Sequence, residues 1–273
     1  MQFINKRNRL YEEPGNKIVT DFIEGQWQED ADRYINLNYE SFEHTAMVNL
    51  TRSEQSDLCC YCMRTLTDKN ITLEHVIPNK TKDQVTFDKY THIKVLKDNL
   101  VLWTNKYIHS KQTLPPFPHF IAYQNLVASC NGELIITNEN ERNPETTEAI
   151  TLHQCCNNRR GSEYIEPLFF YEDVGNLITY SKSGDILYDD EFENTITILN
   201  LNHDSLVLMR KAWFEIGKEY SIEAVNSALL DDEKRLDILD DIDLDVNLKE
   251  TLEKEIYWNL LFQYKWFYSY YKN

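Results

Sequence analysis

The chain has 273 residues, of which 42% are hydrophobic and 12% aromatic, so it carries enough apolar side chain for a packed core. No apolar run approaches the roughly 18 residues that a membrane-spanning helix needs, and the first residues lack the apolar stretch of a signal peptide. We therefore expect a cytoplasmic protein without a membrane span. In that setting, clustered cysteines are more often metal ligands than disulfide partners.

The net charge of −17 is unevenly distributed. Residues 163–273 carry 10 basic and 24 acidic side chains, whereas residues 51–162 carry 13 basic and 12 acidic ones. Phosphate binding needs local lysine and arginine, which the near-neutral middle segment could supply. The candidate members of such a basic patch are Lys80, Lys82, Lys106, Lys111, Arg159 and Arg160.

The sequence suggests three parts. Residues 1–58 are expected to form an N-terminal helical platform, because most of their apolar residues fit one or two helices, after a turn at Pro14-Gly15. Residues 59–162 contain all six cysteines and are expected to form a zinc-tied core with two insertions. Residues 163–273 are expected to form an acidic region of strands followed by helices.

Four cysteines have the spacing of a structural zinc site. Cys59 and Cys62 are separated by two residues, as in a zinc knuckle, where a tight turn lets two thiolates reach one tetrahedral ion. This signal is weak alone, but Cys130 and Cys156 could supply the second pair. We therefore predict that these four thiols bind Zn²⁺.

Two further cysteines make the ligand set ambiguous. Cys60 and Cys155 are interpreted as buried packing residues, since a free cysteine packs as a small hydrophobe. Cys155 is adjacent to Cys156 and could replace it as a ligand. His153 is another alternative.

The segment Ile71–Pro78 is predicted to be a strand, because β-branched and apolar residues dominate it until the proline. Its polar pair, Glu74 and His75, should point to opposite faces of that strand. A bend before Pro78 could bring both side chains towards one metal ion and its substrate.

The remainder of the middle segment is predicted to hold two insertions and a short helix. Residues 79–118 form the first insertion, with a strand at residues 98–103. Residues 131–149 are polar and turn-rich, and they form the second. A short helix beginning near Asn157 would present backbone N–H groups and arginines to a phosphate.

Strands and then helices are predicted in the C-terminal region. The predicted strands are residues 168–171, 177–180 and 195–199, with a turn at residues 183–185. The predicted helices are residues 206–220 and 249–273. The last helix is crowded with aromatic residues, which favours core packing or partner docking over base stacking. Together with the acidic run at residues 231–245, it is predicted to form a docking or self-association surface rather than a DNA-binding one. The alternative is a solvated charge run that caps an ordinary helical subdomain.

The motif blocks in the cysteine-containing segment resemble those of HNH endonucleases. In chain order they are Cys59-x-x-Cys62, Glu74-His75-Val76-x-Pro78, Asn125-Leu126 and Cys156-Asn157-x-x-Arg160-Gly161. That family builds its site on a ββα-metal fold, in which a hairpin, a connecting loop and a short helix surround one divalent ion. The resemblance therefore implies an α+β protein with this core embedded between the two flanking regions.

Within the family, the sequence looks most like the HNH component of Septu-type anti-phage systems, which operates beside an ATPase. This similarity rests on the flanks of the motif blocks. They are Gln55-x-x-Leu58-Cys59-Cys60-Tyr61-Cys62, Ile165-Glu166-Pro167-Leu168-Phe169, and Leu199-Asn200-Leu201-Asn202 followed by Arg210-Lys211. The resemblance implies an endonuclease that cleaves DNA in bacterial defence together with an ATPase partner.

The resemblance also implies a role for each polar residue of the blocks. His75 would be the general base, because a neutral imidazole can take a proton from water near neutral pH. Glu74 and Asn157 would supply the oxygen ligands that suit a catalytic Mg²⁺ or Mn²⁺. Asn125 would hold the loop and orient His75, and Arg160 would lie near phosphate.

A second assignment of the motif is open. Asn99 and His109 also form a His-Asn-His series with His75 and lie nearer to it in the sequence. We favour Asn125 and Asn157, because Asn157 directly follows a cysteine in a block with Arg160 and Gly161. The other histidines of this region, His92, His109 and His119, are interpreted as surface or loop residues.

Two alternatives to DNA cleavage are compatible with the same residues. One is a zinc-stabilised module that recruits a partner and has no catalysis of its own. The other is RNA cleavage at the same site. Only a nuclease requires Glu74, His75 and Asn157 to converge around an open metal position.

Overall fold

The computed structural model describes most of the chain. The described residues are 1–31, 33–35, 38–42, 44–81, 85, 89–90, 118–134 and 154–272. Most of both predicted insertions, with the strand at residues 98–103, lies outside them, as do His92, Asn99, His109 and His153. Three of the basic-patch candidates also lie outside, namely Lys82, Lys106 and Lys111.

Two helices and a short strand pair form the N-terminal part. They are α1 (Arg9–Gly25), β1 (Trp27–Gln28), β2 (Arg33–Tyr34) and α2 (His44–Glu54). The predicted turn at Pro14-Gly15 is wrong, because α1 continues through both residues. Gly15 is buried there, and a Cβ on it would lie 2.4 Å from a ring atom of Tyr123. Packing against that ring therefore explains the glycine.

The centre of the molecule is an antiparallel strand pair with a short helix beside it. Strand β3 (Ile71–His75) pairs with β4 (Leu126–Cys130), in a register that runs from Ile71↔Cys130 to His75↔Leu126. The predicted strand at residues 71–78 is therefore confirmed for its first five residues. Helix α6 (Cys156–Arg160) contacts β4, which confirms the predicted short helix.

The first part of the C-terminal region is more helical than predicted. It contains α7 (Val174–Leu177), β5 (Thr179–Tyr180), β6 (Ile186–Leu187), α8 (Glu193–Ile198) and α9 (Asp204–Glu219). The predicted strands at residues 168–171 and 195–199 are wrong, since the first is mainly a 3₁₀ helix and the second lies in α8. Tertiary contacts override the β-branched sequence: Thr195 Oγ1 accepts from the backbone N–H of Glu166 at 2.8 Å.

Two other predictions for this region are confirmed. The turn at residues 183–185 connects β5 to β6, which pair antiparallel. Gly184 has a φ of +93°, and a Cβ there would lie 2.1 Å from the carbonyl oxygen of Val207, so only glycine fits. The helix predicted at residues 206–220 is α9, with nearly the same bounds.

Five short helices complete the chain. They are α10 (Ile222–Ser227), α11 (Asp232–Asp241), α12 (Val246–Leu252), α13 (Glu255–Phe262) and α14 (Trp266–Lys272). The single helix predicted at residues 249–273 is wrong, because the chain breaks at Lys254, which is extended, and again after Phe262. The second break lets Gln263 bond to the cysteine loop, where its carbonyl oxygen accepts from Thr65 N at 2.6 Å.

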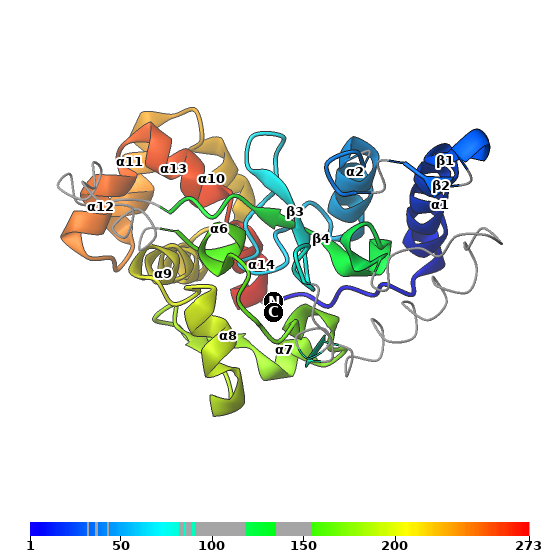
Figure 1. The fold of residues 1–273 in the computed structure, drawn as a ribbon. Coiled ribbons are helices and arrows are strands. Elements are labelled where there is room, and N and C mark those ends of the chain that lie inside the picture. The colour runs from blue at the N-terminus through cyan, green and yellow to red at the C-terminus, as the bar shows by residue number, and fades with distance from the viewer. Residues whose placement is uncertain are drawn as a thin grey trace, which may run out of the picture.

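The β3–β4 pair lies between two groups of helices (Figure 1). Helices α1 and α2 lie on one side, and their apolar faces form a small core with Tyr123 and Leu126. Helices α8 to α13 lie on the other side, and the larger core there includes all six cysteines and side chains from all three predicted parts. Within the described ranges, none of the helices combines the length and apolar character needed to span a bilayer.

Candidate metal centre

Four buried thiols converge between the hairpin and α6. The Sγ atoms of Cys59, Cys62, Cys130 and Cys156 all lie within 4.8 Å of one another. The Cys59–Cys156 and Cys62–Cys130 Sγ–Sγ distances are 3.9 and 3.7 Å. A tetrahedral zinc ion with Zn–S bonds of about 2.3 Å requires sulfur–sulfur edges of about 3.8 Å. The cluster predicted from the cysteine spacing is therefore confirmed, and it could bind a metal such as zinc.

Each thiol is positioned by the backbone around it. The loop that holds Cys59 and Cys62 closes with a hydrogen bond from Met63 N to Cys59 O at 3.2 Å. Cys130 is the last residue of β4, and its N–H donates to Cys59 Sγ at 3.3 Å. Cys156 begins α6 with a φ of +56°, which is unusual for a residue with a Cβ. This strained backbone aims its thiol into the cluster.

The geometry favours Cys156 over Cys155 as the fourth ligand. Cys155 is fully buried and its Sγ lies 3.4 Å from that of Cys156, but it is outside the group of four. Cys60 is 1% exposed and also lies outside the group. Burial raises the pKa of the Cys60 thiol well above its usual value, which suits a packing residue.

Asn125 holds together the two loops that flank the hairpin. Its side-chain oxygen accepts from Ile77 N at 2.7 Å, and its amide donates to Ile77 O at 3.0 Å and His119 O at 2.9 Å. Its own carbonyl accepts from Val76 N at 2.9 Å. The side chain is 1% exposed, so it fixes the backbone on either side without reaching solvent.

His75, at the end of β3, is held in one tautomer. Its Nε2 donates to the carbonyl of Phe120 at 2.8 Å, so Nδ1 is the unprotonated nitrogen. The ring of Tyr39 lies against it, with 4.4 Å between centroids, and covers part of its surface. Burial lowers the pKa of His75 to about 4, which keeps the ring neutral near pH 7.

The Arg160 guanidinium lies inside the protein. It donates to Glu74 Oε1 at 2.5 Å, to the carbonyls of His75 and Val76 at 2.7 and 2.6 Å, and to that of Glu163 at 3.1 Å. It is 1% exposed, so the expectation that it faces a phosphate is wrong. Because a buried guanidinium needs many acceptors, this side chain is used instead to join α6 to the end of β3.

Glu74 is buried, and the hydrogen bonds from its neighbours reach one of its two carboxylate oxygens. Tyr61 and Arg160 both donate to Oε1, which leaves Oε2 for another partner. Burial raises the pKa of this carboxyl, and the Arg160 guanidinium opposes part of that rise.

The structure places Glu74 and His75 on opposite faces of β3, so the expected bend does not bring them together. Glu74 contacts Tyr61 and Arg160, whereas His75 contacts Tyr39 and the loop at Phe120. Both residues are still paired with β4, since the strand runs through His75. The physical reason is that the chain can bend only beyond His75, where the pairing of β3 with β4 ends, so Glu74 and His75 keep the alternating orientation of a strand.

Asn157 lies on the same face of β3 as Glu74, but it contacts Thr72, two residues before Glu74 on the strand. Its amide donates to Thr72 Oγ1 at 3.1 Å. Thr72 and Glu74 are two residues apart on one strand, which separates their side chains by about 6.8 Å. One ion at about 2.1 Å from each oxygen requires those oxygens to lie within about 4 Å. The observed hydrogen bond therefore anchors the Asn157 amide at Thr72 rather than at Glu74.

The neighbours of His75 carry no signal in the sequence. The ring of Tyr39 contacts those of His75 and His44, each with 4.4 Å between centroids, and its carbonyl accepts from His44 Nε2 at 2.9 Å. His119 lies in the loop before β4, as one of the two interpretations had it, but it is not a surface residue, since it is 1% exposed and bonded to Pro78 O. No fixed spacing links Tyr39 or His119 to the motif blocks, so only the folded chain reveals these contacts.

Among the described residues, the four cysteines are the one group of histidine, cysteine or acidic side chains close enough to share a metal ion. The comparisons with known proteins do not extend this picture. No protein-family model matches the sequence, and no curated protein matches it.

Proposed function

We propose that the protein is a metal-dependent endonuclease of the HNH type that hydrolyses phosphodiester bonds of DNA. The observation that supports this most is the arrangement of β3, β4 and α6 around the four cysteines, with His75 at the strand end. A hairpin followed by a short helix is the scaffold that the motif blocks imply. We propose that Zn²⁺ at the cysteines has a structural role, because a complete set of four thiolates leaves no open coordination position.

In this proposal His75 is the general base. The carbonyl of Phe120 fixes the proton on Nε2, so Nδ1 can accept a proton from the attacking water. The ring of Tyr39 limits the rotation of the imidazole, and Asn125 fixes the loop after β3. These contacts support a preorganised base, because the ring does not need to turn before the reaction.

Hard oxygen atoms that suit a divalent cation lie on the other face of β3, so the proposal requires a rearrangement of Glu74 or His75 that lets the cation and the base reach one phosphate. Glu74 Oε2 and Asn157 Oδ1 are the atoms that the observed hydrogen bonds leave for it. When bound, Mg²⁺ or Mn²⁺ would stabilise negative charge on the phosphate and on the leaving oxygen. Arg160 would orient Glu74 rather than contact the substrate, since its guanidinium is buried.

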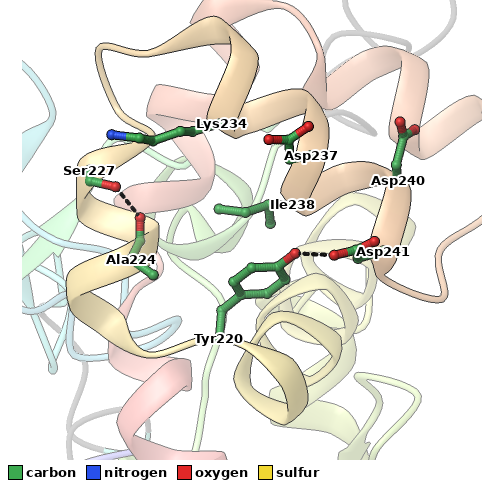
Figure 2. A pocket seen from close by; sticks show the side chains of 8 residues that line it. All are labelled: Tyr220, Ala224, Ser227, Lys234, Asp237, Ile238, Asp240 and Asp241. Carbon is green, nitrogen blue, oxygen red and sulfur yellow. Dashed lines mark hydrogen bonds between the residues drawn. The ribbon is translucent and has the colours of Figure 1, made fainter.

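The acidic C-terminal region supports the proposal of a protein partner, by resemblance an ATPase in anti-phage defence. A pocket of about 590 Å³ lies in this region and is lined by Tyr220 and by acidic residues of α11. Figure 2 shows how these side chains lie. Asp241 accepts a hydrogen bond from the hydroxyl of Tyr220, and Asp237 and Asp240 lie near it. A surface of this sign attracts a basic partner face and repels DNA.

Reversing the charge of this surface tests the partner. The variant has Asp237, Asp240, Asp241 and Asp243 changed to lysine. We expect that the proposed ATPase partner no longer co-purifies with it at moderate salt. All four side chains are exposed, so the fold should tolerate the change. Unchanged complex formation would exclude this segment as the electrostatic contact.

A non-catalytic zinc module is the second candidate. It is favoured by the hydrogen bond from Asn157 to Thr72, which keeps Asn157 away from Glu74. RNA cleavage is a third outcome of the same chemistry. Plasmid nicking with Mg²⁺ or Mn²⁺ separates these functions, with a labelled RNA of the same sequence as a parallel substrate.

The nicking experiment compares the native protein with His75→Ala and His109→Ala. We expect metal-dependent nicking by the native protein and by His109→Ala, and loss of most turnover in His75→Ala with zinc content unchanged. If His75→Ala were active and His109→Ala inactive, the assignment of His75 as the base would be wrong. The series with Asn99 and His109 would then replace it. No nicking by the native protein with its ATPase partner present would favour the module.

A further inference from the structure

A second surface depression differs in chemical character from the acidic pocket. This groove has a volume of about 620 Å³ and is formed by α9, α14 and the turn between β5 and β6. Its aromatic lining consists of Tyr180, Phe214, Trp266, Tyr270 and Tyr271. The groove therefore presents several ring faces in one place.

These rings form a rigid platform. The rings of Trp266 and Tyr270 are stacked, with centroids 5.4 Å apart and an interplanar angle of 27°. The Tyr270 hydroxyl accepts from Tyr180 N at 3.0 Å, and the Tyr271 hydroxyl donates to Ser181 O at 2.9 Å. Since the backbone holds the polar ends, the half-buried ring faces are left for a ligand. Binding to preorganised rings costs little conformational entropy.

The groove is cationic although the region around it is acidic. No carboxylate lines it, and its one charged lining residue, Lys182, is exposed and lies 5.9 Å from the centroid of the Phe214 ring. Asp185, on the turn between β5 and β6, accepts a hydrogen bond from Ser183 and interacts electrostatically with Tyr271. Three other acidic residues of the C-terminal region, Asp237, Asp240 and Asp241, line the pocket in Figure 2 instead.

A buried arginine lies below the floor of the groove. Arg210 is 1% exposed, and its guanidinium carbon is 5.2 Å from the centroid of the Tyr180 ring. It donates to the carbonyls of Gly184 and Leu201 at 3.0 and 2.6 Å. In the described part of the chain no carboxylate forms an ion pair with it. The Cys62 thiol interacts electrostatically with Arg210 and offsets part of its charge, so Lys182 is the main cation of the groove.

We propose that this groove binds single-stranded DNA, with bases stacked on Trp266 and Tyr270 and a phosphate near Lys182. Aromatic faces and a local positive potential are the two features that single-stranded nucleic acids require, and stacking accepts any base. The choice of DNA over RNA rests on the proposed function. The inference also revises the expectation that the whole C-terminal region avoids DNA, because its aromatic and acidic surfaces are separate.

Fluorescence anisotropy of a labelled oligothymidylate tests the proposal, with the zinc-loaded full chain at low salt and without Mg²⁺ or Mn²⁺. Trp266→Leu should weaken binding about tenfold, since stacking of one base contributes about 1–3 kcal/mol. Lys182→Glu should weaken it severalfold and reduce the salt dependence of the dissociation constant. Lys254→Glu makes the same charge change at an exposed site outside the groove, at the start of α13, and should leave binding unchanged.

Lys182→Glu changes an exposed side chain, so it remains informative if Trp266→Leu reduces stability. Absence of binding by the native protein would overturn the proposal, as would equal effects of Lys182→Glu and Lys254→Glu. Tighter binding of oligouridylate than of oligothymidylate would overturn the assignment to DNA. Nicking is measured separately, so binding without nicking contradicts only the proposed function, and nicking without groove binding contradicts only this inference.

Discussion

Arg160 and Glu74 form a buried ion pair that joins the last residue of α6 to the end of β3, with 2.5 Å between Nη1 and Oε1. The same guanidinium also donates to the carbonyls of His75 and Val76. One side chain therefore holds the proposed metal ligand and the backbone of the proposed base. This explains why an arginine follows Asn157 in the motif without contacting a phosphate.

Arg160→Leu is expected to lower the free energy of unfolding by about 3–5 kcal/mol, because it leaves the Glu74 carboxylate buried without its partner. Urea unfolding of the zinc-loaded protein measures the loss. Arg159→Leu changes the neighbouring arginine, which is not fully buried, and should cost much less. The double variant Glu74→Leu/Arg160→Leu should be less destabilised than the sum of its two single variants. Additive losses would contradict a direct coupling between the two side chains.

Zinc content should follow the four-thiol geometry. Cys156→Ser is expected to lose bound zinc and stability together, whereas Cys155→Ser and Cys60→Ser should keep one zinc per chain. Elemental analysis and thermal unfolding of the purified variants check this. Normal zinc content in Cys130→Ser would contradict the ligand set. Zinc loss in Cys155→Ser, with normal zinc content in Cys156→Ser, would show that Cys155 and not Cys156 is the fourth ligand.

Removing the partner of Asn157 should favour the catalytic cation. Thr72→Val deletes the hydroxyl that accepts from the Asn157 amide, so Asn157 should reach the Glu74 face more easily. We expect half-maximal nicking at a severalfold lower Mn²⁺ concentration than for the native protein. Thr81→Val lies on the loop beyond β3 and provides a matched control that should behave as the native protein does. A higher Mn²⁺ requirement in Thr72→Val would show that Thr72 supports the site.

The stability of the fold should decrease in weak acid because of His75. Burial lowers its pKa from 6.5 to about 4 in the folded state, so the unfolded chain binds more protons between these values. The contribution of neutral His75 to the free energy of unfolding is therefore present above pH 6.5 and is lost as the pH falls towards 4. Between pH 7.5 and 5 it amounts to about 2 kcal/mol. Urea unfolding at both pH values should show this decrease in the native protein and a smaller one in His75→Gln.

The cysteine spacing predicted the four-thiol cluster well, because two thiols with two residues between them can share an ion only through a tight turn. The strand around Glu74 and the helix after Cys155 were also recognisable from local residue patterns. The positions of Arg160 and His75 were not. Their surroundings come from Tyr39, Tyr61 and Phe120, which lie on other segments and have no fixed spacing from the motif.

The errors in the C-terminal region have a similar origin. Thr195 and Ile196 are β-branched and favour a strand locally, but the contact of Thr195 with Glu166 stabilises a helical turn instead. The aromatic run after Lys249 has no proline or glycine to mark a break. The break after Phe262 arises because Gln263 bonds to Thr65 and Arg64, which are distant in the sequence.

The proposed role of His75 as general base can be tested most directly by chemical rescue. His75→Gly removes the imidazole and leaves space beside Tyr39 for a free imidazole molecule. We predict that this variant, with its zinc and its ATPase partner present, does not nick plasmid DNA in Mn²⁺ unless imidazole is added. Activity should then rise with imidazole concentration and should depend on the pKa of the added base. Nicking by His75→Gly at the native rate without imidazole would contradict the account.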